Sequence, residues 1–86
     1  MAWEIKFKKK AEKNLDKIPA RYQDRILAVL PEIAKNPFLG KKLDGELAGL
    51  YSHQVWPYRI IYKIYKKILV IIIIRIKHRG RGVYKR

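Results

Sequence analysis

The sequence predicts a single α+β domain in which a four-stranded antiparallel sheet carries two N-terminal helices on one face. The first residues alternate between apolar and polar side chains, and two segments then carry apolar residues three or four positions apart. The second half is rich in Ile, Tyr and Val and has only two-residue interruptions. A chain of 86 residues can bury one core, so we expect residues 1–86 to form one domain and exclude a multidomain enzyme.

The N-terminal strand is predicted over residues 2–7. Trp3, Ile5 and Phe7 alternate with Glu4 and Lys6, as in a strand with one buried face.

Two helices are expected next. In residues 9–18, apolar side chains recur at Ala11, Leu15 and Ile18, and Pro19 ends the helix because it lacks a backbone N–H. The second helix presents Tyr22, Ile26, Val29 and Ile33 on one face and stops at Asn36-Pro37. Pro31 lies inside it and predicts a kink or an early end.

Residues 37–49 are predicted to be a loop. They contain Pro37 and three glycines, and Leu39, Leu43 and Leu47 are expected to pin the loop to the core.

Three strands follow, over residues 50–55, 58–65 and 68–76. The breaks Trp56-Pro57 and Lys66-Lys67 are so short that the strands must form an antiparallel meander. A two-residue loop at Trp56-Pro57 places Val55 opposite Tyr58, with the core on that face. The core face then holds Tyr51, His53, Val55, Tyr58, Ile60 and Tyr62, and the other face holds Ser52, Gln54, Arg59, Ile61, Lys63 and Tyr65.

The last strand is apolar on both sides from Ile68 to Ile74, which is typical of a strand covered on both faces. The helices cover one face only. We therefore expect a partner segment, or a part of this chain that folds back, to shield the other face.

The charge predicts an anionic partner. The chain carries a formal net charge of +14, and all seven acids lie before Leu47, whereas residues 47–86 hold ten cations. A surface that is merely soluble mixes both signs, so we expect polyanion binding by the second half. A membrane surface is the weaker polyanion, because these cations lie between strand-like runs and not along an amphipathic helix.

The composition excludes two kinds of stabilising site. The chain has no cysteine, so disulfides and thiolate metal sites are excluded, and we expect no metal or other cofactor. The N-terminal residues show no apolar signal core, and the longest apolar run is too short to span a membrane, so we expect a cytoplasmic protein.

Several motifs of the second half resemble those of the RelE/ParE superfamily of toxins from toxin–antitoxin systems. They are Leu50-Tyr51-Ser52, Tyr58-Arg59-Ile60-Ile61-Tyr62, Ile76-Lys77-His78-Arg79 and Val83-Tyr84, in an order of elements that matches along essentially the whole chain. The resemblance implies a RelE-like toxin domain over residues 1–86, and a small cognate antitoxin that binds it, in a toxin–antitoxin hetero-oligomer. It also implies one of two activities: ribosome-dependent cleavage of mRNA in the RelE-like branch, or noncatalytic poisoning of DNA gyrase in the ParE-like branch.

For cleavage, the resemblance places the catalytic groups at Arg59, His78, Arg79 and Tyr84, with Arg81 as the alternative to Arg79. Metal-free attack of a 2′-hydroxyl on the adjacent phosphate needs a base, an acid and cations that meet the developing charge. Tyr84 is the candidate base, because the neighbouring cations should lower the pKa of its phenol. Arg59 and Arg79 would hold the phosphate, and His78 would accept a proton or orient the substrate. The residues expected to bind RNA are Ser52, Gln54, Lys63, Lys77, Arg81, Lys85 and Arg86.

Strand 50–55 departs from the RelE pattern. RelE presents two lysines there, where this chain has Ser52 and Gln54. This departure favours a ParE-like gyrase inhibitor and also leaves a catalytically weak RNA-binding module open, whereas the other motifs make the mRNA nuclease the leading hypothesis.

Overall fold

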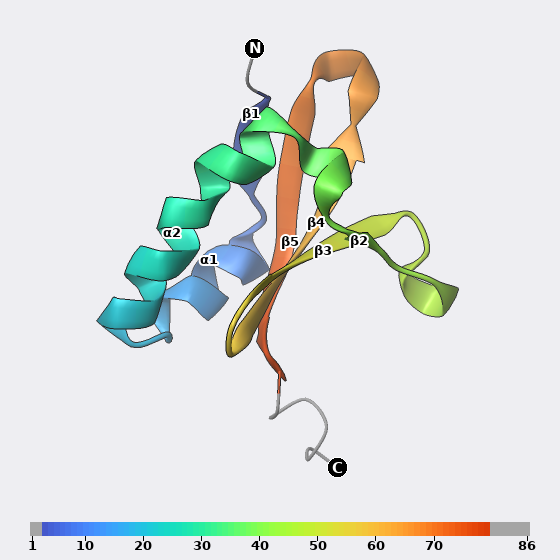
Figure 1. Ribbon diagram of the computed structural model, residues 1–86. Coiled ribbons are helices and arrows are strands. Elements are labelled where there is room, and N and C mark those ends of the chain that lie inside the picture. Colours follow the sequence, from blue (N-terminus) through green and yellow to red (C-terminus); the bar gives the residue numbers. More distant parts are fainter. Residues whose placement is uncertain (1–2, 80–86) are drawn as a thin grey trace.

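The computed structural model describes residues 3–79, which form one five-stranded sheet with two helices on one side (Figure 1). The strands are β1 (Glu4–Phe7), β2 (Lys41–Lys42), β3 (Leu50–Val55), β4 (Tyr58–Tyr65) and β5 (Val70–His78). The helices are α1 (Lys9–Asp16) and α2 (Ala20–Lys35), and short 3-10 turns cover Pro37–Leu39, Gly45–Leu47 and Lys66–Ile68. The α+β class and the two helices on one face are confirmed.

The prediction of a four-stranded antiparallel sheet was wrong in two respects. The strand order is β1-β5-β4-β3-β2, and β1 pairs with β5 in parallel, with Glu4 beside Val70. An alternating pattern predicts a strand but not its direction, and the long connection from β1 to β5, which includes both helices and three strands, permits parallel pairing. The fifth strand, β2, has only two residues, too few for a periodic signal.

The β3–β4 hairpin has the predicted register. Val55 lies opposite Tyr58, His53 opposite Ile60 and Tyr51 opposite Tyr62. Strand β5 starts two residues later than predicted, because Lys66–Ile68 form a 3-10 turn and Leu69 adopts a left-handed conformation with φ 56°.

The core lies between the helices and the sheet. Ile26 and Ile33 of α2 pack with the sheet residues Ile60, Tyr62, Ile71 and Ile73, all of them buried. Helix α2 continues through Pro31, so the predicted early end was wrong. Pro31 itself is exposed, and the helix can lose its hydrogen bond to the Leu27 carbonyl because Ile33 and Ala34, which follow it, are buried. On the outer face of β5, Ile72 and Ile74 are only half-buried, as expected for a strand that lacks a full second cover.

Two hydrogen bonds join elements far apart in the sequence. The Asn14 side chain of α1 accepts a bond of 3.0 Å from the backbone N–H of Ile76 in β5. The buried Tyr62 hydroxyl donates a bond of 2.7 Å to the carbonyl of Pro37, the first residue of the 3-10 turn that follows α2.

The leucines of segment 37–49 do not pin it to the core, contrary to prediction. Leu39 is 79% exposed and Leu47 is also exposed, while Leu43 is half-buried and lines a surface cavity; Pro37 is the buried residue of the segment. The bond from Tyr62 and the pairing of β2 with β3 hold the segment instead. In residues 3–79, no helix is long and apolar enough to cross a membrane.

Candidate nucleic-acid interface

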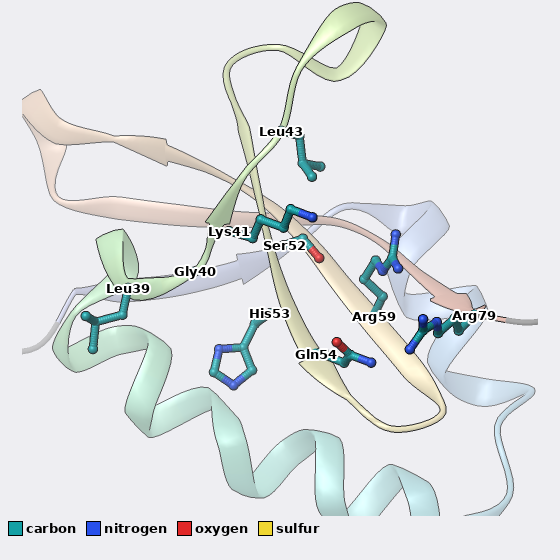
Figure 2. Close-up of a pocket in the computed structure, with 9 residues that line it drawn as sticks. All are labelled: Leu39, Gly40, Lys41, Leu43, Ser52, His53, Gln54, Arg59 and Arg79. Carbon is teal, nitrogen blue, oxygen red and sulfur yellow. The ribbon is translucent and has the colours of Figure 1, made fainter.

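A cavity of about 430 Å³ opens where segment 37–49 meets the β3–β4 hairpin (Figure 2). Three of its lining residues are cations and none is an acid. The described residues that line it are Leu39, Gly40, Lys41, Leu43, Ser52, His53, Gln54, Arg59 and Arg79. A cavity of this charge suits an anionic group such as a phosphate.

The strand register brings its polar groups together. Lys41 pairs with Ser52 across β2 and β3, and Gln54 pairs with Arg59 across β3 and β4. Arg59 in turn pairs with Lys77 of β5, so a polar row crosses three strands on the outer face of the sheet. Residues paired across neighbouring strands project to the same face, which makes this row a consequence of backbone pairing.

Arg79 reaches the cavity from the end of β5. Its backbone N–H donates a bond of 2.7 Å to the Pro57 carbonyl in the β3–β4 turn. Its guanidinium carbon lies 5.2 Å from the centre of the Trp56 ring, a cation–π contact. Figure 2 shows Gln54 and Arg59 on the same side of the hairpin as Arg79.

The wall of the cavity depends on close packing at Gly40. A Cβ atom there would overlap the Tyr62 hydroxyl and would lie 3.0 Å from the Ser52 carbonyl oxygen. Burial raises the pKa of Tyr62 to about 12, with a further contribution from Tyr51, because both disfavour the phenolate. Tyr62 is therefore a neutral hydrogen-bond donor that fixes the wall.

The structure brings four of the predicted site residues into this cavity: Arg59, Arg79, Ser52 and Gln54. Lys77 lies beside Arg59 in the adjacent strand, whereas Lys63 lies farther along β4 with its ammonium 5.1 Å from the Tyr65 ring. His78 is not among the lining residues, and its ring packs edge-on against Tyr58 at 5.2 Å. The predicted residues Arg81, Tyr84, Lys85 and Arg86 lie outside the described part of the chain.

Sequence reasoning missed two polar groups of the site. His53 was expected to be a buried core histidine, but it is half-buried and lines the cavity, and Figure 2 shows its ring directed away from Arg59 and Arg79. Lys41 comes from a segment interpreted as a plain loop. The Lys41-Lys42 pair was its one visible signal, and only the contact between β2 and β3 places Lys41 beside Ser52.

No group of three or more His, Cys, Asp or Glu side chains within residues 3–79 is arranged to hold a metal ion. The groups gathered at the cavity are guanidinium, ammonium, imidazole, amide and hydroxyl, which bind anions and transfer protons.

Comparison with known proteins agrees with this fold. Residues 5–83 match the family described as the ParE toxin of type II toxin–antitoxin systems, parDE. The chain is 34% identical to toxin RelG of Mycobacterium tuberculosis, in an alignment that covers all of both proteins.

Two solved structures have the same fold. One is the toxin–antitoxin complex RelBE2 of M. tuberculosis, with a TM-score of 0.86, 28% identity, and coverage of 92% of this chain and 100% of that one. The other is the archaeal RelE–RelB complex of Pyrococcus horikoshii, with a TM-score of 0.78, 30% identity, and coverage of 94% and 99%. The family match spans nearly all of the chain, and both structures reproduce the arrangement of its elements. The chain therefore belongs to the RelE/ParE superfamily of toxins of type II toxin–antitoxin systems.

Proposed function

We propose that this toxin inhibits translation by cutting mRNA in the ribosome, without a metal ion. The observation that carries the proposal is the acid-free cavity in which Arg59 and Arg79 line one space with Lys41. The relatives with 30% identity or more are named RelG and RelE, which supports the RelE-like branch.

In the proposed reaction, the ribose 2′-hydroxyl oxygen attacks the adjacent phosphorus, and the bond from phosphorus to the 5′-oxygen breaks. A base takes the 2′-hydroxyl proton, and an acid gives a proton to the departing 5′-oxygen. The guanidinium groups of Arg59 and Arg79 offer paired N–H donors to the phosphate oxygens, whose negative charge grows in the transition state.

The proton-transfer groups have two candidates. Tyr84 remains the proposed base on the strength of the family resemblance. Of the two histidines, His53 directs its ring away from Arg59 and Arg79. His78, the last residue of β5 and the one before Arg79, therefore remains the proposed second proton-transfer group, also on the strength of the family resemblance.

The toxin–antitoxin complexes among the solved relatives support an antitoxin as the protein partner. An acidic segment of such a partner would lie over the cationic cavity and exclude RNA from it. We propose that the antitoxin neutralises the toxin in this way, in a hetero-oligomer.

Primer extension on mRNA in a translation extract tests the proposal. We expect discrete cuts that require ribosomes, and a rate at least about 100-fold lower for Arg59→Ala, since it removes a preorganised charge. Arg21→Ala, an exposed arginine on α2, is the matched control and should cut normally. Tyr84→Phe, His53→Ala and His78→Ala then assign the proton-transfer groups.

A gyrase-inhibiting toxin is the second candidate. The family match is to a ParE toxin, and Ser52 and Gln54 occupy the positions where RelE presents lysines. Loss of gyrase supercoiling activity while mRNA stays intact would establish this function and overturn the nuclease.

A further inference from the structure

Trp56 is exposed at the tip of the β3–β4 hairpin, next to the cavity. The residue is 62% exposed. This is unusual for tryptophan, because its indole ring gains stability by burying a large apolar area in a core. The other tryptophan, Trp3, is half-buried and packs edge-on against Phe38 with ring centres 5.7 Å apart. Trp56 therefore contributes little to the core.

Arg79 connects Trp56 to the cavity. The same guanidinium lines the cavity and lies 5.2 Å from the centre of the indole ring. The bond from the Arg79 N–H to the Pro57 carbonyl holds the end of β5 against the turn that carries Trp56. The anion-binding cavity and an exposed aromatic plane thus share one side chain.

Gln54 adds a neutral polar group at the same place. It precedes Trp56 by two residues, is exposed, and lines the cavity opposite Arg59. An amide offers both hydrogen-bond donors and an acceptor, as the edge of a nucleobase does.

We propose that Trp56, supported by Arg79, is a stacking surface for a base of single-stranded RNA whose neighbouring phosphate lies in the cavity. The inference rests on the proposed RNA-cutting function and names a subsite for its substrate. Aromatic side chains bind bases of any sequence through their π faces, and nearby cations bind the backbone. A nucleotide satisfies both parts of the surface, whereas a protein segment would need an acid and an aromatic or apolar group at matching positions.

Binding of two short RNA analogues tests the subsite. One is a pyrimidine oligoribonucleotide, and the other is an abasic ribose-phosphate oligomer of the same length and charge. Fluorescence anisotropy at low salt should give a dissociation constant at least about fivefold lower for the oligomer with bases, as expected for one stacked base. Trp56→Leu should abolish this difference and leave binding of the abasic oligomer unchanged.

A second readout locates the base. In the Trp3→Phe background, Trp56 is the single indole, and the oligomer with bases should quench its fluorescence more than the abasic one does. Trp56→Phe, which retains an aromatic ring, should keep part of the preference for bases.

The proposal is overturned if both oligomers bind equally, if neither binds, or if Trp56→Leu keeps the preference for bases. Loss of antitoxin binding by Trp56→Leu with unchanged RNA binding would assign Trp56 to a protein interface and would also overturn it. These binding assays do not depend on cleavage. A toxin that prefers the oligomer with bases yet leaves mRNA intact in the translation extract would therefore confirm the Trp56 subsite and refute only the proposed nuclease activity.

Discussion

The hydrogen bond from Tyr62 to Pro37 should stabilise the fold and the cavity wall together. Tyr62→Phe removes the hydroxyl donor. The carbonyl of Pro37, the buried first residue of the 3-10 turn, then loses its hydrogen-bond partner. The net value of a hydrogen bond, together with the cost of an unpaired buried acceptor, predicts a loss of about 1–2 kcal/mol in the free energy of unfolding at pH 8. Urea denaturation followed by circular dichroism measures this loss, and Tyr65→Phe, at the half-exposed end of β4, is the matched control.

The pH dependence gives this prediction a sharper form. The pKa of Tyr62 is about 12 in the folded protein, against an ordinary value of 10.0. Between these values the unfolded chain binds fewer protons than the folded one, so stability falls as pH rises. At pH 11 this effect should cost the wild type about 1.4 kcal/mol. Tyr62→Phe lacks the titrating group, so the stability advantage of the wild type should shrink by that amount from pH 8 to pH 11.

The measured quantity is the difference in free energy of unfolding between the wild type and Tyr62→Phe. The titration of the many lysines cancels in this difference, because both proteins contain them. A constant difference from pH 8 to pH 11 would refute the reasoning, because it would mean that Tyr62 titrates alike in both states. A difference near zero at pH 8 would show that the bond to Pro37 contributes nothing.

Three further changes test other parts of the fold, each by urea denaturation. Gly40→Ala should cost about 1–3 kcal/mol, because the new Cβ would displace the Tyr62 hydroxyl; full stability would show that the wall adjusts freely. Asn14→Ala should cost about 1–2 kcal/mol, since the Ile76 N–H loses its acceptor in α1, and an unchanged midpoint would contradict this. Leu69→Gly should stabilise by about 1 kcal/mol by relieving the left-handed backbone of an exposed leucine, and a loss would show that its side-chain contacts outweigh that strain.

The salt dependence of RNA binding tests the phosphate contacts. Arg59→Gln and Arg79→Gln should each lower the slope of log affinity against log salt by about 0.7, the value for one phosphate contact on a single strand. Arg21→Gln, on the helical face, should leave the slope unchanged, and equal slopes for all three variants would place the RNA elsewhere.

Local sequence patterns determined most of the secondary structure. Alternation in residues 3–7 and helical spacing in residues 11–33 each report which side of an element is buried, and that information is local. The hairpin register followed from the two-residue break at Trp56-Pro57, because so short a turn leaves one pairing for Val55 and Tyr58. The resemblance of the motifs to RelE/ParE toxins was likewise visible in the chain alone, and the family match confirms it.

The sequence by itself therefore determined the α+β class and the positive second half, since these depend on composition and short-range spacing. Arg59 and Arg79 were named by the family resemblance, and the tertiary structure placed both of them in one cavity. Only the tertiary structure decided that β1 runs parallel to β5, that Lys41 joins the cavity, and that His53 lines it while His78 packs on Tyr58. Each of these depends on contacts between residues distant in sequence, and the shape and packing of the whole molecule select among arrangements that the local patterns leave equally allowed.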